Sequence, residues 1–166
     1  ATMMNKCLEI IEAYYLFNLK PKQIDVLIHP ESIIHSIVNY MDGSSLCQFS
    51  EPNMQIPISY ALGYPDRITS GKCAFDLSLI ENLTFSKVDH DKFPSIKYAY
   101  TSLDNPSKSC LIINAANELA VNAFLEKKIS FLSIYSIIED SFSISLNNSC
   151  SNIEDILDAD EISRQK

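Results

Sequence analysis

Apolar residues at the start of the chain recur with the period of a helix. A helix turns about 100° per residue, and this spacing puts four of them on one side: Met4, Leu8, Ile11 and Tyr15. Thr2 is the predicted N-cap, because its hydroxyl can accept a hydrogen bond from a first-turn amide, and Pro21 closes the segment. The pattern therefore predicts an amphipathic helix between Thr2 and Pro21.

Short β-branched runs follow this helix. Residues 23–29 predict a buried strand and residues 32–41 a second strand. Asp42-Gly43 predicts a hairpin with a two-residue type I′ turn, in which both residues have positive φ, and residues 45–49 form the return strand. Up to about residue 63 the sequence therefore predicts an α/β layer that contains an antiparallel pair.

The rest of the chain is predicted to be mostly helical. The expected helices cover residues 54–62, 75–83, 93–100, 114–127, a run from 134 and 153–163. Residues 64–76 predict a connecting loop, and residues 101–109 a polar loop around Pro106. Asn114 is the predicted N-cap of its helix, with Glu118 in the first turns.

Composition narrows the class of protein. With 166 residues, 46% hydrophobic residues and a mean hydropathy of +0.02, the chain has a globular composition and room for one domain or two small lobes. A net charge of −8 argues against broad nucleic-acid binding. We find no apolar stretch long enough to cross a bilayer and no signal peptide, so we expect a cytoplasmic protein. None of the five cysteines forms a Cys-x-x-Cys pair, so neither a zinc cluster nor a redox motif is indicated.

The polar face of the first helix holds the main candidate chemistry. Relative to Asn5, Lys6 lies at roughly 100° and Glu9 at roughly 40° around the helix axis. Free first-turn amides beside Asn5 and Lys6 would favour an anion such as phosphate, and Glu9 could give an oxygen to a hard cation. The alternative is a solvated face with an ordinary Lys6–Glu9 ion pair, and these three residues alone favour that alternative.

The histidines and one methionine are weaker candidates. His29 and His35 could act as a general base or hydrogen-bond donor, but their spacing does not give a plain metal pair, and half-buried structural roles are favoured. Met54 follows Glu51-Pro-Asn and could cover a ligand, although methionine more often fills a core.

Six ordered runs of the chain resemble 1-deoxy-D-xylulose 5-phosphate reductoisomerases of the non-mevalonate isoprenoid pathway. They are residues 1–13, 26–36, 42–44, 51–54, 56–58 and 114–118. The resemblance implies an α+β fold: the C-terminal half of an α/β catalytic domain with an antiparallel hairpin (1–63), a linker with a short helix (64–89) and a small α-helical C-terminal domain (90–166). It also implies that an NADPH-binding domain precedes this chain in a longer enzyme.

The resemblance assigns roles residue by residue. Asn5 and Lys6 match the pair that binds the substrate phosphate. Glu9 matches a catalytic glutamate that ligates Mg²⁺ or Mn²⁺ and contacts substrate. His35 matches a histidine that supports catalysis, and Met54 matches a methionine near the nicotinamide of the cofactor.

The chain departs from the family pattern at two of these runs. Cys7 replaces the usual glycine after Asn-Lys, and Glu31 replaces the usual glutamine after His-Pro. Neither change removes an expected ligand, although Cys7 could alter packing under the helix.

The implied activity is the NADPH-dependent rearrangement and reduction of 1-deoxy-D-xylulose 5-phosphate to 2-C-methyl-D-erythritol 4-phosphate. We expect a homodimer that acts on a sugar phosphate, needs divalent metal, and binds neither nucleic acid nor membrane. The residues present here are expected to be inactive by themselves. An alternative of a different class is a truncated, non-catalytic remnant or dimerisation module that keeps the fold.

Overall fold

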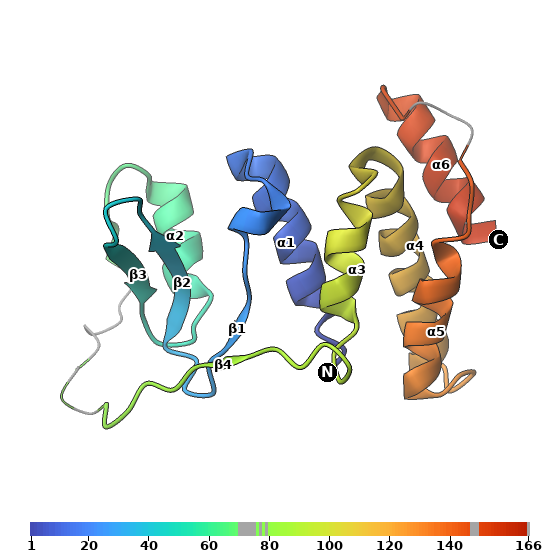
Figure 1. The fold of residues 1–166 in the computed structure, drawn as a ribbon. Helices are drawn as coiled ribbons and strands as arrows, with labels where there is room; N and C mark the ends of the chain where they lie inside the picture. The colour runs from blue at the N-terminus through green and yellow to red at the C-terminus, as the bar shows by residue number, and fades with distance from the viewer. Residues whose placement is uncertain (70–75, 77, 79, 147–149, 166) are drawn as a thin grey trace. The chain divides into compact units, whose positions relative to one another are not determined.

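The computed structural model describes residues 1–69, 76, 78, 80–146 and 150–165 and contains two compact units. The helical unit comprises Ala1–Val26 and Val88–Lys166, and the hairpin unit comprises Leu27–Lys87. The helices and strands, shown in Figure 1, are α1 (Met4–Phe17), η1 (Pro21–Gln23), β1 (Leu27–Ile28), β2 (Ile34–Asn39), β3 (Ser45–Phe49), α2 (Gln55–Gly63), β4 (Ser86–Lys87), α3 (Ser95–Ser102), α4 (Pro106–Leu125), α5 (Phe131–Ser141) and α6 (Ile153–Gln165). The predicted α+β class is confirmed.

The helical unit is built around α4. In this unit α1 packs on α3, α3 packs on α4, and α4 also receives α5 and α6 (Figure 1). Five fully buried isoleucines fill the interfaces: Ile10, Ile96, Ile113, Ile134 and Ile138. Each removes apolar surface from water and stabilises the unit by about 1.5–3 kcal/mol, which makes this helical packing the main source of its stability.

The buried face of α1 differs in part from the predicted stripe. Met4 and Ile11 are buried as predicted, but Cys7 and Ile10 are the most buried residues of the helix and Tyr15 is half-exposed. The helix packs chiefly on α3, so its buried face is set by that contact and lies to one side of the predicted stripe.

The β2–β3 hairpin forms as predicted, with a different turn. The strands pair from Ile34↔Phe49 to Asn39↔Ser45. Gly43 has φ of 86° and its amide donates to Tyr40 O, while Tyr40 N donates to Ser44 O. The described turn places positive φ at Gly43 and not at Asp42, so the predicted type I′ turn is wrong. The Asp42 carboxylate instead accepts from Ser44 N and Ser44 Oγ, which favours a longer loop.

The strand predicted over residues 23–29 is much shorter than expected. Pro21 begins a 3₁₀ turn that takes up residues to Gln23, and only Leu27–Ile28 form β1. Its partner is β4, a two-residue strand that the sequence does not signal, and Leu27 is exposed. The predicted buried strand is therefore wrong.

Helix α4 begins eight residues before the predicted start at 114. Pro106 occupies its first turn, where a proline is tolerated because the amide it lacks would have no partner within the helix. Since α4 already covers residues 106–114, the predicted polar loop over 101–109 and the predicted Asn114 N-cap are both wrong. Ser130 caps α5 by accepting from Ser133 N at 3.2 Å. Residues 75, 77 and 79 of the helix predicted over 75–83 lie outside the described residues, and residues 80–83 are not helical.

The compact units do not follow the predicted division into 1–63, 64–89 and 90–166, which stays a prediction. They group α1 with the C-terminal helices because α1 packs on α3. Among the helices that the structure describes, none is long and apolar enough to cross a membrane.

Candidate functional site

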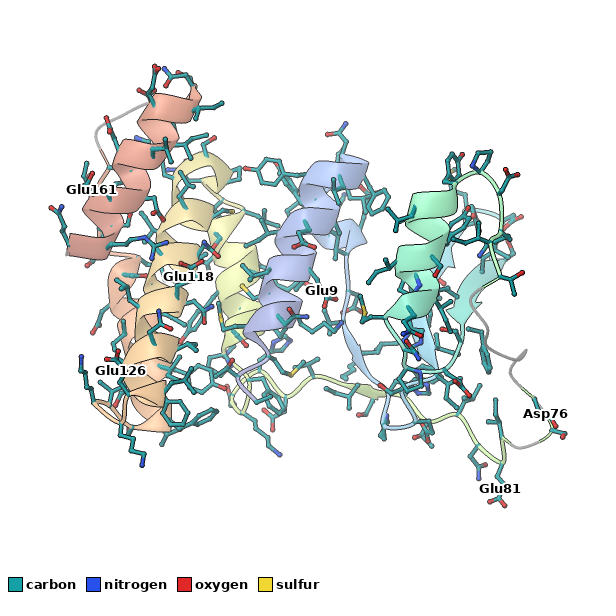
Figure 2. All side chains as sticks on the ribbon, turned by 180° about the vertical axis from the view of Figure 1, so that it is seen from behind. Glu9, Asp76, Glu81, Glu118, Glu126 and Glu161 are labelled. Carbon is teal, nitrogen blue, oxygen red and sulfur yellow. The ribbon has the colours of Figure 1, made fainter. Side chains whose placement is uncertain are left out.

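The outer face of α1 brings three predicted site residues together. Asn5 Nδ2 donates to Glu9 Oε1 at 2.5 Å, and Lys6 Nζ donates to Glu9 Oε2 at 2.5 Å. The side chains of Lys6 and Glu9 are 45% and 43% exposed, and Figure 2 shows Glu9 on the side of α1. The ordinary Lys6–Glu9 ion pair that the sequence suggested is therefore present, and Asn5 joins it.

The start of α1 offers fewer free amides than the sequence predicts. Met3, with φ of 55°, is the N-cap in place of Thr2. Met3 O accepts from Lys6 N at 3.0 Å, and the Thr2 hydroxyl accepts from Met4 N at a long 3.4 Å. The predicted N-cap is wrong, and the donors that this face offers an anion are chiefly Asn5 Nδ2 and Lys6 Nζ.

Each oxygen of Glu9 accepts one hydrogen bond, so a ligand that needs the whole carboxylate or the whole ammonium competes with these contacts. The ion pair is solvent-exposed, and such pairs stabilise by about 0–1 kcal/mol. Opening it therefore costs little compared with a charge-assisted bond to phosphate or a bond to a metal. The three side chains fit a face that exchanges an internal pair for an anion and a cation.

The donor set for a metal is incomplete in the part of the chain that the structure describes. A hard divalent cation takes about six oxygen ligands, and Glu9 supplies one carboxylate. No group of three His, Cys, Asp or Glu side chains among the described residues could hold a metal. Glu9 fits as one ligand of a site that needs further carboxylates.

His35 lies in the hairpin unit at an irregular point of β2. The pairing of β2 with β3 shifts register between Ile34 and Ser36, which places His35 at a bulge. Its Nε2 lies 3.1 Å from Ser50 O. Because a carbonyl only accepts, Nε2 bears the proton, and Nδ1 is the nitrogen left to accept in the neutral ring.

Met54 lies at the N-cap of α2 and is 71% exposed. The core-filling alternative is therefore wrong for this methionine, since its thioether does not pack inside the described unit. An exposed thioether at a helix start is free to cover a ligand. The role near a nicotinamide stays a prediction.

One cluster of the hairpin unit does not follow from the sequence. His29 Nδ1 lies 2.9 Å from both Thr84 O and Glu31 Oε2. Thr84 Oγ1 and Thr84 N donate to the two Glu31 oxygens at 2.6 and 3.2 Å, and these hydrogen bonds hold the pKa of Glu31 below its ordinary value. The partners are more than fifty residues apart, and only the pairing of β1 with β4 brings them together.

Fold and site define an α+β chain with an amide, an ammonium and a carboxylate on one exposed helix face. Residues 49–166 match the model of the DXP reductoisomerase C-terminal domain, so the chain belongs to this family.

Curated relatives extend the match to nearly the whole chain. The 1-deoxy-D-xylulose 5-phosphate reductoisomerase of Ruthia magnifica is 46% identical over 165 residues, which cover 99% of this chain and 43% of the relative. That of Ehrlichia canis is 47% identical over 167 residues, with 99% and 43% coverage. The chain thus spans about two-fifths of the length of these relatives.

Solved structures agree with the sequence comparison. The reductoisomerase of Zymomonas mobilis in complex with NADPH superposes with a TM-score of 0.92 at 38% identity and covers 99% of this chain and 44% of that one. A DOX-P reductoisomerase in complex with NADPH, fosmidomycin and magnesium gives a TM-score of 0.89 at 42% identity, with 99% and 43% coverage.

Proposed function

We propose that this chain is part of an NADPH-dependent reductoisomerase that converts 1-deoxy-D-xylulose 5-phosphate to 2-C-methyl-D-erythritol 4-phosphate. The single observation that supports this most strongly is the Asn5, Lys6 and Glu9 cluster on one exposed face, in a chain that belongs to the reductoisomerase family. An ammonium and an amide suit a phosphate, and a carboxylate beside them suits a divalent metal.

Asn5 and Lys6 bind the phosphate of the substrate in this proposal. Lys6 gives the charge and Asn5 gives an amide donor, while Glu9 turns its carboxylate to Mg²⁺ or Mn²⁺ and to the substrate. Holding a phosphate that does not react fixes the position of the carbons that do, so binding energy at this end lowers the barrier elsewhere.

The metal and NADPH supply the chemistry that amino acids lack. A bound divalent cation polarises hydroxyl and carbonyl oxygens, and NADPH supplies a hydride. From this chain Glu9 fits as one metal ligand, and the exposed thioether of Met54 fits a contact with the nicotinamide. His35 supports the site as a hydrogen-bonding group. Most NADPH contacts and the other metal ligands belong to a part of the enzyme outside these residues.

The exposed apolar surface of the hairpin unit is an argument for an assembly larger than this chain. Of its described residues only Ser50 is buried, and apolar side chains are exposed on β2, β3 and α2, among them Val38, Leu46, Ile58 and Leu62. We propose that the rest of the enzyme and a second subunit of a cytoplasmic homodimer cover this surface. The net charge of −8 disfavours nucleic acid as a partner.

A turnover assay tests the proposal. The protein expressed from its complete coding sequence should oxidise NADPH only when both 1-deoxy-D-xylulose 5-phosphate and Mn²⁺ or Mg²⁺ are present. Residues 1–166 alone should give no product, because a single carboxylate cannot hold the metal. A complete protein without turnover would contradict the enzyme and favour a non-catalytic remnant, and product formation by residues 1–166 alone would refute the metal argument.

A further inference from the structure

A buried histidine that the proposed chemistry does not use lies at the turn before β2. The side chain of His29 is 7% exposed, and its ring stacks on Phe85 with ring centroids 4.6 Å apart and an interplanar angle of 13°. Its Nδ1–H donates to Thr84 O at 2.9 Å, and Glu31 Oε2 lies 2.9 Å from the same nitrogen. The ring is therefore fixed in one tautomer and in one orientation.

Glu31 connects the same turn to the same strand. Its carboxylate accepts hydrogen bonds from Thr84 Oγ1 and Thr84 N, and its Oε2 lies 2.9 Å from His29 Nδ1. A glutamine, which the family usually has here, offers one acceptor oxygen and no charge, so it could not accept from the two Thr84 donors through separate oxygens or form an ion pair with the imidazole. The carboxylate thus gives this chain a stronger link between residues 29–31 and Thr84.

Three hydrogen bonds, joined by the backbone of residues 32–33 and of Ser50, connect the turn with His35. Ser32 N donates to His29 O at 3.1 Å and closes the turn. The carbonyl oxygen of the next residue, Ile33, accepts from Ser50 N at 3.1 Å, and Ser50 O accepts from His35 Nε2. Ser50 is buried, and the run that ends at Met54 starts directly after it.

We propose that His29, Glu31 and Thr84 form a latch that positions His35 and the run from Glu51 to Met54 for the reaction. The effect on catalysis rests on the proposed function, whereas the geometry of the latch does not depend on it. In this proposal the three latch residues are positioning residues, which act through the turn and Ser50. Opening the latch frees the turn, loosens Ser50 and lets the His35 ring lose its single tautomer.

Imidazole ¹⁵N NMR on histidine-labelled protein, expressed from the complete coding sequence, tests the latch. In the wild type His35 should be the Nε2–H tautomer. Glu31→Ala removes the two hydrogen bonds from Thr84 and the ion-pair contact with His29, and Thr84→Val removes the hydroxyl donor and keeps the shape. Both should give a mixture of His35 tautomers and roughly tenfold faster exchange of the Thr84 amide, while Thr84→Ser should retain the wild-type spectrum.

Asp42→Ala is the matched control. Asp42 also accepts a backbone amide and a hydroxyl, both from Ser44, but it lies at the hairpin turn and does not contact the latch. It should leave the His35 tautomer unchanged. An unchanged tautomer in Glu31→Ala and Thr84→Val would overturn the latch, including the case in which these variants only lower the melting temperature.

Kinetics separate the latch from the proposed function. If the wild type turns over, Glu31→Ala should lower kcat/KM about tenfold and Asp42→Ala should not, because misplacing a binding group by a fraction of an ångström has effects of this order. Tautomer mixing with unchanged kinetics would overturn the positioning role. A wild type without turnover refutes the proposed function, and the NMR result then still decides whether the latch fixes His35.

Discussion

Lys6→Ala should weaken binding of the phosphosugar far more than it affects folding. The side chain is 45% exposed, and its ion-pair partner is Glu9 on the same helix face. Losing an exposed pair of this kind costs about 0.3–0.5 kcal/mol, and the better helix propensity of alanine offsets a few tenths of that. The expected change in melting temperature is below about 2 °C for a chain of this size.

Under the proposed function, the same substitution removes a charged donor from the substrate phosphate. Hydrogen bonds to charged groups contribute about 1.5–3 kcal/mol, which corresponds to roughly a 10- to 150-fold rise in KM for the phosphosugar. Steady-state kinetics on protein from the complete coding sequence and calorimetry on the same samples measure the two effects separately.

Lys97→Ala is a suitable control for Lys6→Ala. Lys97 on α3 forms an exposed ion pair with Asp91 at 3.1 Å, and no role in the site is proposed for it. It should match Lys6→Ala in stability and leave KM unchanged. Equal KM values for the two variants would refute the phosphate site on α1, and a fall in melting temperature above about 5 °C in Lys6→Ala alone would show a structural role instead.

Three further outcomes test the packing and the latch. Ile113→Ala, at a fully buried position of α4, should lower the free energy of unfolding by about 2–5 kcal/mol in urea titrations, and a loss below 1 kcal/mol would contradict the assigned core. Arg164→Lys should speed hydrogen exchange in α6 nearly as much as Arg164→Ala, because the Arg164 guanidinium bonds Asp160 and Glu118 through two nitrogens, which a single ammonium lacks. Full protection in the lysine variant would refute this; Glu118 is labelled in Figure 2. Hydrogen bonds from Thr84 lower the pKa of the Glu31 carboxyl from 4.5, so its stabilisation is present above that value and is lost as the pH falls through the folded-state pKa. The difference in free energy of unfolding between wild type and Glu31→Gln should therefore be constant near neutral pH and shrink in acid. A difference that grows in acid would contradict this sign.

Local patterns predicted the hairpin and most helices, because their causes lie within a few residues. Asp42-Gly43 marked the turn between β2 and β3, and the run at 153–163 became α6 nearly unchanged. The failures have non-local or positional causes. Pro106 signalled a loop but starts α4, since a proline in the first turn loses no helical hydrogen bond. The short β1 depends on β4, which lies far along the chain and has no pattern of its own.

The predicted site residues on α1 lie together because their arrangement, too, depends only on residues close in sequence. Glu9 is four residues after Asn5 and three after Lys6, and side chains at these two spacings are neighbours on a helix, so the geometry of the three followed from spacing alone. Sequence spacing could not predict the latch, because Thr84 is more than fifty residues from His29 and Glu31 and contacts them only where β1 and β4 pair.

The division of α1 into two faces connects folding with the proposed chemistry. Cys7 and Ile10 on the inner face hold the helix through packing, so the polar outer face is not needed for stability. An outer face held only by a weak ion pair can exchange that pair for phosphate and metal at little cost. Had Lys6 and Glu9 been buried, breaking their pair would have left charges without partners in the core, and the same three side chains would have been poor ligands.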